Sequence, residues 1–246
     1  MQRLLVLGGN GYVGQNICRA ALDSGKYAVA SLSRSGPPST PNPCLTANSH
    51  LMDEIEWMKG DIFDVARRDE AFGGVDVIIS TIGAFGNNEY MEKICGDATV
   101  DAVESAAKHK VKQFGFISSA QVGKTTEFSS SMPLYGYFRG KAKAEEAIKR
   151  LFPHSHVIAR PGFIYGPRVA GAIGTLPLQL VGAPINFIST RCGPISSVIQ
   201  AVPFLGTEAS SMVPVGCVGD AMIKTLLDKN GDGACTLSAE KIRKFA

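Results

Sequence analysis

The sequence Leu4-Leu5-Val6-Leu7-Gly8-Gly9-Asn10-Gly11-Tyr12-Val13-Gly14 joins an apolar run to a glycine-rich turn and then to an amphipathic segment that ends near Ser24. This order predicts a strand, a tight turn and a helix, with Gly14 allowing close helix–strand packing. The first turn of such a helix presents backbone amides to an anion. We therefore predict a pyrophosphate cradle made by Gly8, Gly9, Asn10, Gly11, Tyr12, Val13 and Gly14; a tight turn without a nucleotide is the alternative.

The composition is that of a globular protein of moderate size. The 246 residues are 45% hydrophobic and 19% charged, and the net charge of +3 is too small to indicate nucleic-acid binding. Six cysteines are scattered without a Cys-x-x-Cys pair, which is typical of reduced thiols and does not predict a metal site. The N-terminus leads directly into a strand pattern, so no secretory signal peptide is expected in this chain.

Apolar runs and helical patterns alternate along the chain. Strands are expected at 27–32, 55–61, 75–80, 113–119 and 156–160, and helices at 65–71, 90–109 and 134–151. This alternation predicts an α/β fold with a doubly wound parallel sheet, the Rossmann fold. The proline-rich stretch 35–50 is expected to be a surface excursion without a regular element. A helix at 220–228 and a strand and short helix within 234–244, with Ser238 as N-cap, are expected at the end.

The end of the second strand bears on which dinucleotide is bound. An acidic residue there hydrogen-bonds the adenosine ribose and selects NAD, whereas an arginine accommodates the 2′-phosphate of NADP. The chain has Ser33 and Arg34 at this place. We therefore predict NADP(H); the alternative is that Arg34 is a solvated loop charge.

Ligands of open parallel sheets bind at the carboxyl ends of the strands, so the residues that follow the other strands are also candidates for the cofactor site. Small residues at these ends let the backbone approach the cofactor, and Pro161 and Gly162 end the sixth strand with a turn. The predicted cofactor-binding residues at these ends are Asp61, Ile62, Thr81, Ile82, Gly83, Ser118, Pro161, Gly162 and Phe163.

Tyr137 and Lys141 are the candidates for chemistry. They are four residues apart in a helical pattern and therefore share one helix face. A lysine ammonium beside a phenol and a nicotinamide ribose lowers the pKa of the phenol, which prepares it as a general acid or base toward a carbonyl or an alcohol. Ser119, at the end of the fifth strand, could hydrogen-bond the same substrate oxygen. The alternative is a solvated helix face.

Several motifs together resemble the atypical or extended short-chain dehydrogenase/reductases: the glycine stretch at 8–14, Ser-Leu-Ser-Arg-Ser-Gly at 31–36, Lys-Gly-Asp-Ile at 59–62, Phe-Ile-Ser-Ser-Ala at 116–120, Tyr137-x-x-x-Lys141 and Arg-Pro-Gly-Phe-Ile-Tyr-Gly at 160–166. The stretches 85–94 and 161–166 resemble most the branch with the NADPH-binding accessory subunit of respiratory complex I, the fungal accessory protein of coenzyme Q biosynthesis and plant organellar relatives. The resemblance implies a bound NADP(H), with Ser119, Tyr137 and Lys141 as catalytic residues and Lys141 also on the cofactor. It also implies that the nucleotide can be held without turnover.

The stretch 169–219 has only Arg191 and Glu208 as charged residues among its 51. Five prolines divide it into apolar pieces of about ten residues, which are too short to span a membrane. Three interpretations stay open: a lid for a hydrophobic substrate, a surface that docks on a membrane or a partner subunit, or the core of a small lobe.

We therefore expect an NADP(H)-binding Rossmann domain over 1–168 and an apolar C-terminal lobe over 169–246 within one domain. One functional hypothesis is an NADP-dependent oxidoreductase that acts on an apolar carbonyl or alcohol, such as a quinone or prenyl-lipid intermediate. The other is a non-catalytic accessory or assembly subunit of a membrane-associated mitochondrial complex that binds NADPH structurally. Both imply an organellar location, in the first place the matrix side of a mitochondrial membrane, with plastid and cytoplasm as alternatives.

Overall fold

The computed structural model describes residues 1–47, 50–123, 134–167, 212–229 and 233–245, and its centre is a parallel sheet. Seven strands follow the order β3-β2-β1-β4-β5-β6-β9, and every neighbouring pair is parallel. Two further strands, β7 and β8, pair separately. The strands are β1 (Gln2–Leu7), β2 (Tyr27–Ser33), β3 (Ile55–Lys59), β4 (Val77–Ser80), β5 (Gln113–Ile117), β6 (His156–Arg160), β7 (Ile164–Tyr165), β8 (Val213–Pro214) and β9 (Cys235–Ser238).

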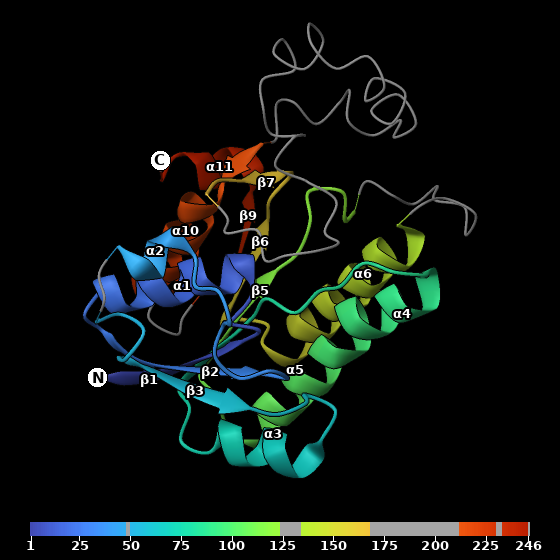
Figure 1. Ribbon diagram of the computed structural model, residues 1–246. Coiled ribbons are helices and arrows are strands. Elements are labelled where there is room, and N and C mark those ends of the chain that lie inside the picture. Colours follow the sequence, from blue (N-terminus) through green and yellow to red (C-terminus); the bar gives the residue numbers. More distant parts are fainter. Residues whose placement is uncertain (48–49, 124–133, 168–211, 230–232, 246) are drawn as a thin grey trace, which may run out of the picture.

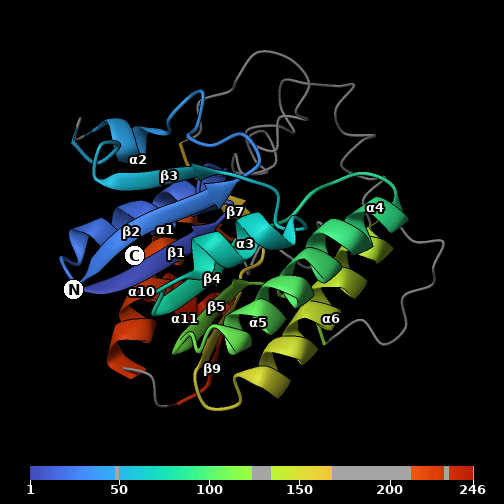
Figure 2. The same ribbon diagram turned by 90° about the horizontal axis from the view of Figure 1, so that it is seen from below.

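Helices cover both faces of the sheet (Figures 1 and 2). The helical elements are α1 (Tyr12–Asp23), α2 (Pro43–Thr46), α3 (Val65–Phe72), α4 (Asn88–Glu92), the π-helical turn η1 (Lys93–Asp97), α5 (Ala98–Lys108), α6 (Tyr135–Leu151), α10 (Val215–Lys229) and α11 (Ala239–Arg243). The alternation along β1 separates two cores: Leu4 and Val6 pack with α1 and α10, whereas Leu5 and Leu7 pack with α5 and α6. The predicted doubly wound fold is confirmed.

The helix expected at 90–109 differs from the observed one in its interior. It begins at Asn88, where the side chain of Asn87 accepts a hydrogen bond from the Tyr90 N–H, and it contains the π turn before α5. At this turn the helix meets α6 closely, since a Cβ added to Gly96 would lie 2.8 Å from the Gly140 Cα. The sequence pattern detects a helix here but not its change of pitch.

The expectation for 35–50 was wrong in one respect, because a helical turn, α2, lies within it. Pro43 stands in the first turn of α2, where a missing N–H costs nothing. Leu45 is fully buried, and the N–H of Asn42 donates to Gln15 Oε1 at 2.7 Å. This excursion is therefore packed onto α1 and closes the core beside β2 and β3.

The C-terminal elements complete the main sheet and its cover. The helix expected at 220–228 begins earlier, at Val215, and crosses α1 so closely that a Cβ on Gly219 would lie 2.5 Å from the Asn16 carbonyl oxygen. β9 adds to β6, and Ser238 caps α11 by accepting from the Lys241 N–H. Residues 212–229 and 233–245 thus belong to the layers of the sheet.

Most of the apolar stretch that was expected to form a C-terminal lobe lies outside the described residues, so the boundary at 168 and the role of 169–211 stay predictions. None of the helices in the described part of the chain has the length and apolar character needed to cross a membrane.

The glycine turn sets the distance between β1 and α1. Gly8 has a φ of +79°, which is in the left-handed region that favours glycine, and its N–H donates to the Leu32 carbonyl at 2.9 Å. A Cβ on Gly14 would collide with the Gly8 carbonyl oxygen and lie 2.7 Å from the Gly9 Cα. Both neighbours are backbone, so a side chain at position 14 can be accommodated only by moving the helix.

We expect Gly14→Ala to lower the free energy of unfolding by about 1–3 kcal/mol, as overpacking does in well-packed interiors. Gly216→Ala is the matched control, because this helical glycine has open space around its Cβ position and the substitution favours the helix. Urea denaturation followed by circular dichroism measures both variants. Equal stability of Gly14→Ala and wild type would contradict the close contact.

Candidate functional site

The turn between β1 and α1 forms one wall of the candidate site. Gly11 is the N-cap residue of α1, and as a glycine it has no side chain that could cap the helix. Its N–H donates to the Gly8 carbonyl at 2.9 Å, and a Cβ on Gly11 would meet only that oxygen, at 3.2 Å. The Thr81 hydroxyl lies within hydrogen-bond distance of the Leu7 and Gly8 carbonyls, which ties the end of β4 to the turn. A helix N-terminus open on one side suits an anion.

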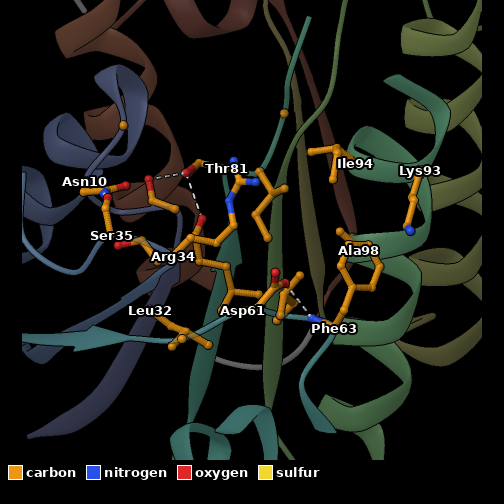
Figure 3. A pocket seen from close by; sticks show the side chains of 18 of the residues that line it. Asn10, Leu32, Arg34, Ser35, Asp61, Phe63, Thr81, Lys93, Ile94 and Ala98 are labelled. Carbon is orange, nitrogen blue, oxygen red and sulfur yellow. Dashed lines mark hydrogen bonds between the residues drawn. The ribbon is translucent and has the colours of Figure 1, made fainter. Parts of the chain in front are cut away.

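A cavity of about 410 Å³ opens at the carboxyl ends of β1, β2, β3 and β4 (Figure 3). It brings together many residues that the sequence predicted for the cofactor. These residues are Gly8, Asn10, Gly11, Ser33, Arg34, Asp61, Ile62, Thr81, Ile82 and Gly83. Phe63 and Lys93 also line the cavity, although the sequence analysis did not predict them. Phe63 follows β3 and Lys93 begins η1, and their positions at the cavity depend on how these elements pack.

The end of β2 presents a positive charge to the cavity. Arg34 is exposed and forms no ion pair or hydrogen bond with the described residues. The turn beneath it is rigid, since the Ser33 hydroxyl donates to the Gly36 carbonyl at 2.7 Å, and the Asn10 amide donates to the Ser35 hydroxyl at 2.7 Å. The Asp61 carboxylate accepts the Phe63 N–H at 3.0 Å. The backbone that carries Arg34 is thus held in place, and its guanidinium is available to an anionic ligand.

The other residues predicted for the cofactor do not line this cavity. Gly9 and Gly14 serve the packing of the turn, since a Cβ on Gly9 would lie 2.8 Å from the Ser31 Cβ. The exit of β6 lies beside the exit of β5, where the Pro161 carbonyl accepts the Ala120 N–H at 2.8 Å. The predicted residues outside the cavity lining are Gly9, Tyr12, Val13, Gly14, Ser118, Lys141, Pro161, Gly162 and Phe163.

Tyr137 lies in the first turns of α6, half-buried among aromatic rings. Its ring stacks on the Phe85 ring with centroids 5.5 Å apart and planes 13° apart, and it meets the Phe138 ring edge-on at 5.3 Å. Burial raises the pKa of the Tyr137 phenol well above its ordinary value. The phenol is therefore protonated at neutral pH, whereas the lysine effect predicted from the sequence would lower its pKa.

Lys141 is 2% exposed and lies between the ends of β4 and β5. Its Nζ donates to the carbonyls of Ile82 at 3.0 Å and Ile117 at 2.8 Å, and it lies 5.7 Å from the centroid of the Tyr137 ring. Burial lowers the pKa of Lys141 to about 8, against the opposing effects of Cys95 and Glu145. The structure thus places Lys141 beside Tyr137 but bonds its ammonium to the backbone.

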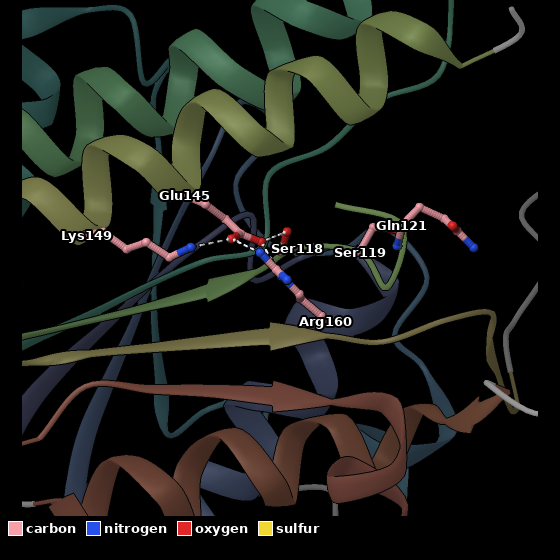
Figure 4. Close-up of polar contacts among 6 residues, drawn as sticks. All are labelled: Ser118, Ser119, Gln121, Glu145, Lys149 and Arg160. Atoms are coloured by element: carbon pink, nitrogen blue, oxygen red, sulfur yellow. Dashed lines mark hydrogen bonds and ion pairs between the residues drawn. The ribbon is translucent and has the colours of Figure 1, made fainter. Parts of the chain in front are cut away.

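A buried carboxylate, Glu145, organises the charges one turn further along α6 (Figure 4). It accepts hydrogen bonds from the Ser118 hydroxyl at 2.6 Å, from Arg160 at 2.8 and 2.6 Å, and from Lys149 at 3.1 Å. Burial raises the pKa of the Glu145 carboxyl, but these hydrogen bonds outweigh burial and hold the pKa below its ordinary value. The network joins α6 to the ends of β5 and β6.

The two predicted serines have different surroundings. The Ser118 hydroxyl is buried and donates to Glu145, whereas the Ser119 hydroxyl accepts the Gln121 N–H at 3.4 Å and lies on the other side of the strand end (Figure 4). Sequence reasoning missed Glu145, although its spacing of four from Lys141 on a helix was a usable signal.

Comparison with known proteins agrees with this geometry. A protein-family model described as NAD(P)H-binding matches residues 8–178. The chain belongs to this NAD(P)H-binding family of short-chain dehydrogenase/reductase-like proteins. It is 36% identical over 245 residues to the chloroplastic protein At1g32220 of Arabidopsis thaliana, covering 100% of this chain and 77% of that protein. The mitochondrial protein FMP52 of Chaetomium globosum is 31% identical over 188 residues, covering 76% and 73%.

A shorter match joins the chain to MIOREX complex component 2 of Saccharomyces cerevisiae, 32% identical over 114 residues, which are 46% of this chain and 38% of that protein. Among solved structures, the UDP-glucuronic acid 4-epimerase of Bacillus cereus in complex with NAD superposes with a TM-score of 0.63 at 17% identity, covering 96% of this chain and 78% of that one. At this identity the likeness supports the fold alone.

The residues of the cavity fit a dinucleotide. The open side of Gly11 is a place that a Cβ would fill, the first turn of α1 can receive a pyrophosphate, and small residues follow β4. The family match makes NAD(P)H the cofactor class.

We expect Glu145→Gln to lower the free energy of unfolding at pH 7 by about 1.5–3 kcal/mol, because it removes the charge-assisted hydrogen bonds to the half-buried Arg160. The lowered pKa of Glu145 means that its contribution is present above the ordinary glutamate pKa of about 4.3 and is lost as the pH falls through the folded-state value. The difference between wild type and Glu145→Gln should therefore shrink in acid. Glu146→Gln, an exposed neighbour on α6, is the control and should follow wild type at every pH in denaturant titrations.

Proposed function

We propose that the protein is an NADP(H)-dependent oxidoreductase that reduces the carbonyl group of an apolar compound in an organelle. The NADP(H) preference is proposed from the Arg34 guanidinium at the end of β2, which has no partner among the described residues. It lies on the wall of the cavity where an NAD-selective protein has an acid. The observation that supports the chemistry is the side-by-side placement of Tyr137 and Lys141 on α6.

The Tyr137 phenol carries its proton at neutral pH with or without the rise in its pKa, and it can therefore act as the acid of a reduction. When bound, the cofactor supplies a hydride to the carbonyl carbon. A protonated phenol can donate its proton to the oxygen that becomes negatively charged, since an alkoxide is far more basic than a phenolate. Lys141, whose ammonium lies beside the ring, would stabilise the phenolate that is left. Ser119 is proposed to hydrogen-bond the same oxygen.

A second candidate function is a non-catalytic accessory subunit that holds NADPH as part of its fold. It is favoured by the stack of Phe85 over Tyr137 and by the two carbonyls that bind Lys141. The yeast relative is named as a component of a complex, and the complex I and coenzyme Q branch of the resemblance also suggests membrane-associated mitochondrial assemblies. Relatives with mitochondrial and chloroplastic names support the organellar location in both cases.

Arg34→Gln tests the cofactor preference. Loss of a charge-assisted contact to the 2′-phosphate should weaken NADPH binding about tenfold and leave NADH binding within about twofold. Isothermal titration calorimetry with both nucleotides gives the two dissociation constants. Equal affinity of wild type for NADPH and NADH, or no change of the ratio in the variant, would remove Arg34 from this role.

Tyr137→Phe separates catalysis from structural binding. Loss of the general acid should lower the rate of NADPH oxidation, with decanal and menadione as apolar carbonyl probes, by about 10²–10⁴-fold. Tyr135→Phe, two residues earlier on the same helix, is the control and should retain activity. If Tyr137→Phe supports a cell that lacks the natural copy as well as wild type does, while Gly11→Val does not, the enzymatic proposal fails and the accessory role stands.

A further inference from the structure

The helix α6 begins without a cap of its own. Its N-cap residue is Leu134, whose apolar side chain accepts no hydrogen bond and whose φ of +64° lies in the left-handed region. A bulky residue adopts this conformation where surrounding contacts hold it there. The first turn of α6, which includes Tyr137, also contains no acid. The N–H groups of this turn therefore need partners from elsewhere in the chain.

Asn88 provides one such partner from α4, which lies side by side with α6 (Figures 1 and 2). Its Oδ1 accepts the Gly136 N–H at 3.0 Å, across 48 positions of the sequence. The helices meet here at backbone distance, because a Cβ on Gly136 would collide with the Asn88 carbonyl oxygen and lie 2.7 Å from the Asn88 Cα. The neighbouring Asn87 caps α4 itself by accepting the Tyr90 N–H at 2.8 Å. The pair of asparagines thus begins one helix and holds the start of another.

The connection between β4 and α4 also contacts both residues proposed for chemistry. The Phe85 ring stacks on the Tyr137 ring, and the Ile82 carbonyl accepts a hydrogen bond from the Lys141 Nζ at 3.0 Å. The first residues of this connection line the cofactor cavity. One segment therefore joins the wall of the cavity to the ring of Tyr137 and, through Asn88, to the backbone directly before it.

We propose that Asn88 is a positioning residue, which sets the place of the Tyr137 hydroxyl by holding the backbone of Gly136. This inference rests on the proposed function, in which Tyr137 donates a proton to the carbonyl oxygen of the substrate. Proton transfer requires the two oxygens to lie within hydrogen-bond reach, and a displacement of about 1 Å can cost about 100-fold in rate. The effect of Asn88 on the rate should therefore pass through Tyr137.

The test compares NADPH oxidation with menadione by the full-length wild type and by Asn88→Ala. Loss of the acceptor should lower kcat about 10–100-fold and leave the NADPH dissociation constant, measured by calorimetry, within about twofold, because Asn88 does not line the cavity. Asn88→Asp keeps an acceptor oxygen, suits a helix N-terminus and should recover most of the rate. Asn88→Gln shifts the amide by one methylene and takes the place of Asn88→Ala if that variant does not fold.

Asn87→Ala is the matched control. It removes the N-cap of α4 at the neighbouring position, so it should lower the unfolding temperature but retain most of the activity. Thermal unfolding without nucleotide measures the stability of each variant.

A double-mutant cycle separates positioning from a general loss of structure. The hydroxyl that Asn88 positions is absent from Tyr137→Phe, so adding Asn88→Ala to it should change the residual rate by less than about twofold. A further loss of about tenfold in that background would mean that Asn88 supports the whole site, and the inference would be wrong.

The outcomes distinguish this inference from the proposed function. If wild type is active and Tyr137→Phe is not, but Asn88→Ala keeps its kcat or Asn87→Ala loses as much, the inference fails while the proposed function stands. If wild type oxidises NADPH with neither menadione nor decanal, or if Tyr137→Phe is as active as wild type, the proposed function itself fails, and this inference falls with it.

Discussion

The contact of Gly14 with the backbone of Gly8 and Gly9 is the constraint on which the site depends. It holds the first turn of α1 against the end of β1, and no side chain fits between them. The helix N-terminus consequently faces the carboxyl edge of the sheet, where the ends of β2, β3 and β4 form the rest of the cavity. On the same face of the sheet, Gly219 allows α10 an equally close approach to α1. The position of the cavity thus depends on glycines that let α1 approach β1, and α10 approach α1, to within direct contact of their backbones.

The interior of α6 raises a different physical problem, because it carries two ionisable groups away from water. Glu145 is stabilised as a carboxylate by three donors, one of them the guanidinium of Arg160. Among the described residues Lys141 has only carbonyl oxygens as hydrogen-bond partners, and burial lowers its pKa to about 8. A bound ribose would change this balance, since its hydroxyls can accept from the ammonium. In the proposed function, the charge beside Tyr137 would therefore depend on the occupancy of the cofactor site.

The sheet and most of its helices could be predicted from local patterns. The apolar run of β1 and the glycine turn are properties of short stretches, and the strand, turn and helix predicted from them are confirmed. The turn α2 was missed because prolines usually indicate irregular structure, whereas here Leu45 gains a place in the core. The stack of Tyr137 on Phe85 and the burial of Lys141 could not be predicted, because both depend on how α6 packs against the rest of the chain.

By itself, the sequence determined the parallel α/β order, the dinucleotide turn and the cation at the end of β2, because each is encoded within a few adjacent residues. Only the tertiary structure decided which residues share the cavity and which charges are neutralised. Lys93 reaches the cavity through a π turn, and its neighbours Glu92 and Asp97 are engaged by residues of α6 some 46 positions away. Such pairings depend on how helices cross, and helix crossing is set by the packing of the whole core rather than by any local pattern.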